Sequence, residues 1–194
     1  MREPFEKEEQ QRDIIVRQCL ECLAEKGLEN VSTRDFSDVT GMTASSLYYW
    51  FKNKDEIVIE TTKYGLGLVV SDLLDYAAKN LMDVTLNYEI FLEFISKYSS
   101  ILRVVLQVAC SPQYGDRVKS YVNDISSLYS IATEKIAKNL NVTCDGLRPI
   151  VDFYVSAIVD YTIWDDEEKI KRELKTIPIM ISKLERSESN KCNK

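Results

Sequence analysis

The apolar residues of this chain recur every three or four positions over most of its length, which is the spacing of one helix face. Ile15, Cys19 and Leu23 form such a stripe in a first helix, expected over residues 6–26 and ended by Gly27. Two short helices follow, and then a fourth helix that begins at about residue 54.

The fourth helix is expected to reach about residue 79, and Gly65 and Gly67 lie in its middle. They mark either a bend or a place where another helix packs closely. Ser99 and Ser100 are expected to divide the next apolar stretch into two helices. Ile177-Pro178 is expected to kink or shorten the last helix. In order, the later helical stretches cover residues 84–109, 113–139, 146–164 and 167–184. The pattern predicts an all-α fold of about nine helices.

The short helices between residues 33 and 51 have clear end signals. Ser32 and Asp35 have the spacing of a capping box, Gly41 suits a left-handed turn, and Thr43 can cap the second helix. Leu47 and Phe51 are four residues apart and would share its inner face. A helix, a glycine turn and a second helix are typical of a helix-turn-helix, although such pairs also occur as ordinary packing units. The outward residues are Ala44, Ser45, Ser46, Tyr48 and Tyr49, followed by Lys52 and Lys54.

Residues 14–59 resemble the DNA-binding domain of the tetracycline-repressor (TetR) family of bacterial transcription regulators. The resemblance rests on several features in the same order: Leu23-Ala24-Glu25-Lys26-Gly27, Ser32-Thr33-Arg34-Asp35-Phe36, Gly41-Met42-Thr43, Leu47-Tyr48, Phe51 and Lys52-Asn53-Lys54-Asp55-Glu56. The sequence departs from the family pattern at Trp50, where histidine or another ring is common. A tryptophan keeps a hydrogen-bond donor but cannot titrate, so whether Trp50 contacts DNA stays open.

The resemblance implies a set of DNA-binding residues on the second and third helices and at the start of the fourth. They are Thr33, Arg34, Thr43, Ala44, Ser45, Ser46, Tyr48, Tyr49, Lys52 and Lys54. Hydroxyl groups and lysines of this kind contact base edges and phosphates.

Charge and composition limit the kinds of binding site and catalytic chemistry that the chain can support. The net charge is −6, and residues 1–63 contain thirteen acidic and nine basic side chains, so a DNA contact would depend on a local basic patch and on salt. The chain has no histidine, so a zinc site at Cys19 and Cys22 and most familiar catalytic constellations are not expected. At least one of these two cysteines is expected in the core. We expect no enzyme activity, cofactor or metal.

The amino terminus is charged and no apolar run is long enough to span a membrane, so a cytoplasmic protein without membrane contact is expected. Aromatic residues in the middle of the chain suit either a plain core or an apolar pocket for a small-molecule effector. The candidate ligand-binding residues are Tyr64, Tyr88, Phe91, Phe94, Tyr98, Leu102, Tyr129 and Tyr154.

The helix expected over residues 146–164 is apolar almost all round, so it needs cover on two sides. A second copy of the chain can supply one side, and the family resemblance implies the same homodimer, built by the last two helices. The candidate dimerisation residues are Phe153, Ile158, Tyr161, Leu174, Ile177 and Ile181.

Together these features predict a DNA-binding domain over residues 1–56, a ligand-binding and dimerisation domain over 57–186, and a disordered tail over 187–194. The hypothesis is a one-component regulator, in most such proteins a repressor, released from palindromic operator DNA by a small-molecule ligand. The alternative is a helical protein-interaction module whose helix-turn-helix contacts a protein.

Overall fold

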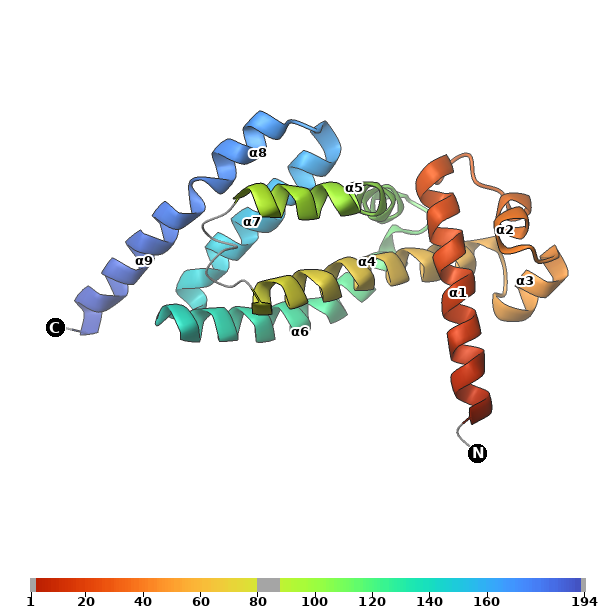
Figure 1. Ribbon diagram of the computed structural model, residues 1–194, viewed down its shortest axis with the longest axis horizontal. Coiled ribbons are helices and arrows are strands. Elements are labelled where there is room, and N and C mark those ends of the chain that lie inside the picture. The colour runs from red at the N-terminus through yellow and green to blue at the C-terminus, as the bar shows by residue number, and fades with distance from the viewer. Residues whose placement is uncertain (1–2, 80–87, 193–194) are drawn as a thin grey trace. The chain divides into compact units, whose positions relative to one another are not determined.

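The computed structural model describes residues 3–79 and 88–192, and every regular element in these ranges is a helix. In chain order the helices are α1 (Glu3–Lys26), α2 (Thr33–Thr40), α3 (Ala44–Trp50), α4 (Lys54–Lys79), α5 (Tyr88–Cys110), α6 (Gly115–Leu140), α7 (Cys144–Trp164), α8 (Glu167–Leu174) and α9 (Ile177–Cys192) (Figure 1). The all-α fold expected from the sequence is confirmed.

The helices form two compact units. The first contains the described residues up to Val70 together with Ser100–Val122, and the second contains those of Ser71–Ser99 and from Asn123 onward. Helices α4, α5 and α6 each contribute one part to each unit. The first unit therefore includes more of the chain than its three amino-terminal helices.

The core of the first unit draws apolar side chains from all six of its helical segments. Its buried members include Ile15, Cys19, Cys22, Leu23, Phe36, Leu47, Phe51, Ile57, Val108 and Val118. A Cβ atom at Gly65 would lie 3.0 Å from side-chain carbons of Leu20 on α1 and Ile101 on α5. Helix α4 runs through this position without interruption. Gly65 therefore marks close helix packing rather than a bend.

Both cysteines of the Cys19/Cys22 pair are buried free thiols, which confirms the expectation that at least one lies in the core. Burial raises the pKa of Cys19 to about 12. A thiol with so high a pKa stays protonated and unreactive at neutral pH.

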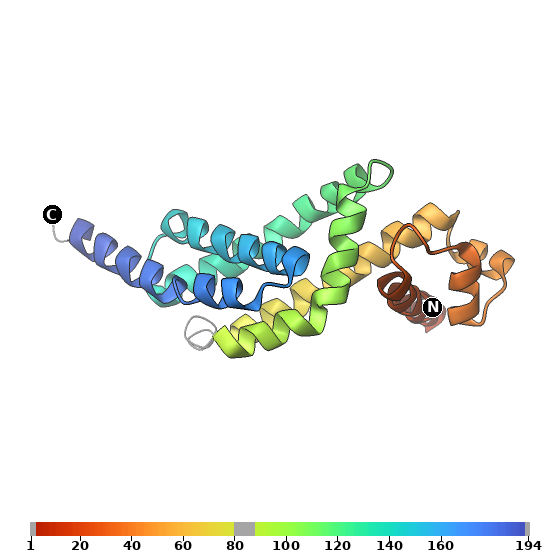
Figure 2. The same ribbon diagram turned by 90° about the horizontal axis from the view of Figure 1, so that it is seen from above.

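In the second unit, α8 and α9 both pack against α7 (Figure 2). Lys169 on α8 pairs with Asp160 on α7 at 2.6 Å. A Cβ at Gly146 would lie 2.6 Å from Leu184, so the start of α7 and the middle of α9 are in close contact. In the part of the chain that the structure describes, no helix is long and apolar enough to cross a membrane.

Three expected boundaries are wrong. Helix α5 continues through Ser99 and Ser100, because serine costs a helix little and the apolar spacing continues across the pair. The helix expected over residues 167–184 is two helices, since Pro178 lies in the first turn of α9, where its missing N–H is tolerated. The first error predicted one helix too many and the second one too few, so the expected total of about nine agrees with the helices of the described residues.

The third error concerns the carboxy-terminal tail, because residues 187–192 continue α9. Several hydroxyl groups form hydrogen bonds in this stretch. The Ser187 and Ser189 hydroxyls donate to the carbonyls of Leu184 and Glu185, and the Thr143 hydroxyl donates to the Glu188 carboxylate at 3.3 Å. The Thr143 contact links this polar stretch of α9 to the residue that caps α7.

Candidate nucleic-acid interface

Polar caps define the ends of α2 and α3. The Ser32 amide donates to the Asp35 carboxylate at 2.7 Å, and the Asp35 amide donates to the Ser32 hydroxyl at 3.3 Å, which completes the expected capping box. Gly41 has a φ of 64°, in the left-handed region that suits glycine. The Ser46 amide donates to the Thr43 hydroxyl at 3.1 Å. All three end signals read from the sequence are confirmed.

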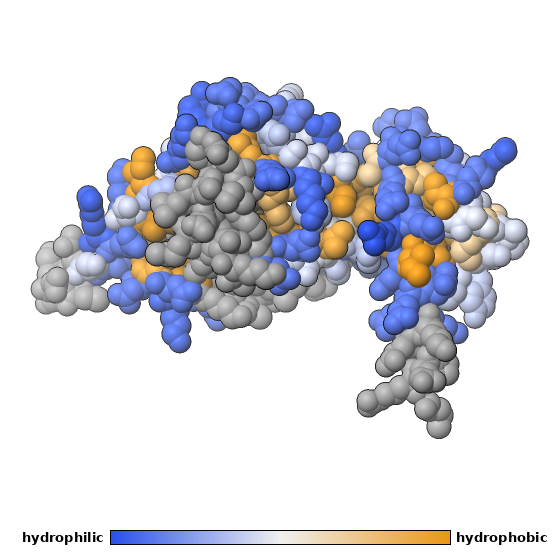
Figure 3. Space-filling model, in the orientation of Figure 1, coloured by the Kyte–Doolittle hydropathy of each residue, from blue (hydrophilic) through white to orange (hydrophobic). Residues whose placement is uncertain are grey.

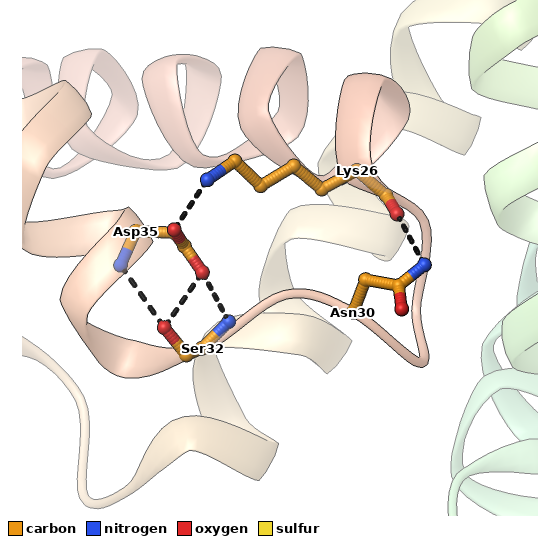
Figure 4. Close-up of polar contacts among 4 residues, drawn as sticks. All are labelled: Lys26, Asn30, Ser32 and Asp35. Atoms are coloured by element: carbon orange, nitrogen blue, oxygen red, sulfur yellow. Dashed lines mark hydrogen bonds and ion pairs between the residues drawn. The ribbon is translucent and has the colours of Figure 1, made fainter.

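An ion pair between Lys26 and Asp35 joins the end of α1 to the start of α2 (Figure 4). The Asp35 carboxylate also accepts two hydrogen bonds from Ser32, through its amide and its hydroxyl. Hydrogen bonds from Lys26 and Ser32 hold the pKa of Asp35 well below its ordinary value. The Asn30 side chain donates to the Lys26 carbonyl at 3.2 Å and closes the connecting loop. The acidic group at the start of α2 thus has its charge paired within the protein.

The inner side of the helix-turn-helix is closed by Phe36, Leu47 and Phe51, which are at most 1% exposed. Phe51 lies just beyond α3, in extended backbone with φ −136° and ψ 133°. It therefore reaches the core through the helix end and not through the helix face that the sequence indicated. The Arg12 guanidinium covers the Phe51 ring at 5.3 Å and pairs with Glu60 on α4 at 2.9 Å.

The ten predicted DNA-binding residues all lie at the surface of α2, α3 and the turn into α4. Thr33 and Lys54 are partly buried, and the others are exposed: Arg34, Thr43, Ala44, Ser45, Ser46, Tyr48, Tyr49 and Lys52. Tyr48 is 44% exposed and Tyr49 is 76% exposed, which is unusual for such large rings. Polar hydroxyl groups and lysines with this exposure can reach base edges and phosphates.

Several of these residues also contact one another. The hydroxyl oxygens of Thr33 on α2 and Tyr48 on α3 lie 3.1 Å apart, at hydrogen-bonding distance. The Thr43 and Ser46 hydroxyls lie 2.9 Å apart. Trp50 packs against the core, and its ring meets the Tyr49 ring edge-on, with centroids 5.4 Å apart and planes at 88°.

The start of α4 is held by contacts that the sequence did not reveal. The Glu56 amide donates to the Asn53 side chain at 2.9 Å, as expected for a cap, but the Glu56 carboxylate accepts from the Lys52 amide. Asp55 accepts hydrogen bonds from the Tyr114 hydroxyl at 3.0 Å and from the Gln113 side chain at 3.1 Å.

The Tyr114 contact unites residues 59 positions apart in the chain. Burial and the neighbouring Asp55 carboxylate raise the pKa of Tyr114 to about 12. A second contact joins the α1–α2 loop to α5, where the Leu28 amide donates to the Gln107 side chain at 3.3 Å. Local sequence patterns carry no signal for pairs this far apart, so only the fold could reveal them.

The candidate ligand-binding residues are divided between the two units. Tyr64 and Leu102 belong to the first unit, and Tyr64 packs against its core. Phe94, Tyr98 and Tyr154 belong to the second. The side chains of Tyr88, Phe91 and Tyr129 lie outside the described residues.

Phe94 and Tyr98 are one helical turn apart on α5, and their ring centroids are 4.9 Å apart. Tyr98 is buried, and its hydroxyl donates to the Asp72 carboxylate on α4. Lys97 lies over the Tyr98 ring at 4.7 Å and pairs with Asp72 at 3.4 Å. Burial and the bond to Asp72 raise the pKa of Tyr98.

The candidate dimerisation residues differ in exposure. Leu174, Ile177 and Ile181 are buried within the single chain, whereas Phe153, Ile158 and Tyr161 are partly buried. The large apolar side chains that remain exposed on the same helices are Val155, Ile163, Trp164 and Ile179. Figure 3 shows apolar side chains interrupting the hydrophilic surface in both units.

Comparisons with known proteins agree with this geometry. Residues 15–61 match the family model of bacterial regulatory proteins of the tetR family. An uncharacterized HTH-type transcriptional regulator from Haemophilus influenzae is 22% identical over 156 residues, which cover 75% of this chain and 76% of that protein.

A similar fold occurs in the crystal structure of PfmR, a TetR family transcriptional regulator from Thermus thermophilus. The match has a TM-score of 0.53 at 17% identity and covers 84% of this chain and 96% of PfmR. The family match covers α2, α3 and the capped turns that place them. Residues 15–61 are therefore similar to the amino-terminal domain of the TetR family of bacterial transcription regulators, and the fold of the chain is similar to that of a TetR family regulator.

Proposed function

We propose that this protein is a homodimeric repressor that binds palindromic operator DNA and leaves it when a small-molecule ligand binds. The observation that carries the proposal is the two-sided character of α3. Its inner residue Leu47 is fully buried, whereas Ala44, Ser45, Tyr48 and Tyr49 are exposed. A short helix that buries one apolar anchor and exposes hydroxyl groups suits insertion into the DNA major groove.

In this proposal residues 1–56 bind the operator DNA, and the protein acts in the cytoplasm. Thr33 and Arg34 contact the DNA from α2, Thr43–Ser46, Tyr48 and Tyr49 contact it from the turn and α3, and Lys52 and Lys54 bind phosphates. Pairing of Asp35 with Lys26 favours this role, because it removes one uncompensated negative charge from the start of α2.

Residues 57–186 would bind the effector and form the dimer. For the effector we propose Phe94, Tyr98 and Tyr154 of the second unit, whose rings and tyrosine hydroxyl groups suit an aromatic or apolar ligand. In the dimer, Phe153, Ile158 and Tyr161 would contact the second copy beside the exposed Val155, Ile163 and Ile179. Leu174, Ile177 and Ile181 would support that surface from within the protomer.

The test is binding of the purified protein to the DNA upstream of its own gene, at low and moderate salt. We expect specific, salt-sensitive binding by the parent, and a large loss of affinity for this DNA in a Tyr48→Ala, Lys54→Ala double variant. A Lys63→Ala variant is the matched control, because Lys63 pairs with Glu60 on α4, away from the candidate DNA-binding residues.

Equal, weak binding by parent and double variant, to this DNA and to other promoter DNA, would contradict the proposal. The remaining candidate would then be a protein-interaction module that uses the surface of α2 and α3. A protein complex disturbed by the same double variant would support that alternative.

A further inference from the structure

The exposed residues of α3 do not share one direction. Successive residues of an α-helix are about 100° apart, so Ser45 and Tyr49, each two positions from Leu47, point about 160° away from it. Leu47 is fully buried, and Ser45 and Tyr49 are exposed. These two residues are one turn apart, and they form the part of α3 most distant from the core.

Tyr48 has a different position. It lies about 100° from Leu47, on the side of α3 that meets the start of α2. Its hydroxyl oxygen lies 3.1 Å from that of Thr33, and its ring is 44% exposed against 76% for Tyr49. Tyr48 is thus held at the edge of the helix, where the neighbouring DNA strand would present its sugar-phosphate backbone.

Trp50 connects Tyr49 to the interior. Its ring packs against the core of the first unit and meets the Tyr49 ring edge-on at 5.4 Å. Edge-on contact is a favourable geometry for aromatic pairs and restricts the motion of the exposed ring. A ring that is fixed before binding loses less conformational freedom when it contacts DNA.

We infer that Tyr49 is the specificity-determining residue of α3, together with Ser45, and that Trp50 is a positioning residue that holds the Tyr49 ring without contacting DNA. The inference rests on the proposed function. The Tyr49 hydroxyl can donate to or accept from a base edge in the major groove, and its ring can contact a thymine methyl group. Tyr48, with Thr33, supports affinity for any sequence.

The experiment first enriches duplexes from a random-sequence pool with the wild-type protein. It then measures the affinity of each variant for the enriched duplex and for a scrambled duplex of equal length, at one salt concentration. The specificity ratio is the affinity for the enriched duplex divided by that for the scrambled one. Tyr49→Ala is expected to lower this ratio by roughly 10-fold or more, the size of a lost base contact. Tyr48→Phe is expected to weaken both complexes by the same factor and leave the ratio unchanged.

The positioning role of Trp50 is tested by comparing a substitution that keeps an aromatic ring with one that removes it. Trp50→Phe keeps a ring against Tyr49, and its specificity ratio is expected to stay within about twofold of the wild type. Trp50→Ala is expected to lower the ratio in the wild-type background but not further in the Tyr49→Ala background, as for residues that act as one unit. Thermal unfolding of each variant shows whether the helix-turn-helix is folded. A purely structural Trp50 would weaken both duplexes equally.

The outcomes are distinct. A wild-type protein that enriches no sequence overturns the proposed function and this inference together. A wild-type protein that enriches a sequence, combined with a Tyr49→Ala variant that keeps the full specificity ratio, overturns the inference alone. A ratio lowered by Tyr48→Phe and not by Tyr49→Ala also overturns it.

Discussion

The helix-turn-helix and the α7–α9 region expose different kinds of side chain. Around α2 and α3 the apolar residues Phe36, Leu47 and Phe51 are at most 1% exposed, and the large exposed rings carry hydroxyl groups. On α7 and α9, by contrast, Ile163 is 54% exposed and Ile179 is 56% exposed. Around α2 and α3 the only large aliphatic side chain left exposed among the described residues is Val39, whereas α7 and α9 expose Val155, Ile163 and Ile179.

This difference indicates two kinds of partner. A surface of hydroxyl groups and lysines over a closed core suits a polar, charged partner such as DNA. Exposed isoleucines on adjoining helices gain free energy when another apolar surface covers them, at roughly 25 cal/mol per Å².

Removal of the Phe36 ring should give the largest loss of stability. Phe36 is completely buried between α2 and the rest of the first core, so Phe36→Ala leaves a cavity and should cost roughly 3–5 kcal/mol in the free energy of unfolding. Urea denaturation followed by circular dichroism measures this loss. Val39→Ala on the same helix is the control, because Val39 is 41% exposed and its truncation should cost less than about 1 kcal/mol. Equal losses for both variants would contradict the closed core described for this unit.

A charge on α7 should act on association and leave the fold intact. Ile163→Asp places a carboxylate in the proposed dimer surface, and we expect dimer dissociation to increase by roughly 30-fold or more, as when an interface hot spot is lost. Because Ile163 is exposed in the single chain, the helix content of the Ile163→Asp protein should equal that of the wild type. Analytical ultracentrifugation over a range of concentrations measures the dissociation constant. A dimer of unchanged affinity in Ile163→Asp and also in Ile179→Asp would place the interface elsewhere.

The sequence predicted the helix-turn-helix well because its signals are local. Ser32, Gly41 and Thr43 each specify a helix end through their own side chain or backbone freedom, within three or four residues. The apolar spacing likewise placed Leu47 inside. Helix boundaries elsewhere were predicted less well, since Ser99 and Ser100 are tolerated inside α5. The helix expected to be kinked or shortened at Pro178 is shortened, because α8 ends at Leu174 and Pro178 lies in the first turn of α9.

Long-range contacts were beyond the reach of sequence patterns. Nothing in the spacing of Asp55 and Tyr114 indicates that they meet, and the pairing of Thr33 with Tyr48 depends on how α2 crosses α3. The ligand-binding and dimerisation residues were chosen by aromatic or apolar character, which does not separate a core residue from a contact residue. The burial of Leu174, Ile177 and Ile181 within one chain shows this limit.

The smallest expected effect concerns the hydrogen bond that attaches the start of α6 to α4 within the first unit. Tyr114→Phe removes the hydroxyl that donates to Asp55 at 3.0 Å, and we expect a loss of about 1–2 kcal/mol in the free energy of unfolding at neutral pH. The pKa of Tyr114 is raised to about 12 in the folded state, from an ordinary value of about 10. Its stabilising contribution is therefore complete below about pH 10 and is lost as the pH rises through about 12.

The wild type and Tyr114→Phe should accordingly differ most in stability at neutral pH and converge under alkaline conditions. Urea denaturation of both proteins across the alkaline range measures the convergence. The difference in tyrosinate absorbance between the two proteins gives the pKa of Tyr114 directly. Asp55→Asn is the informative control, because it keeps an acceptor but removes the charge that opposes ionisation, so the pKa of Tyr114 should fall. A stability difference that stays constant through the alkaline range would contradict the raised pKa of Tyr114 and its dependence on burial and Asp55.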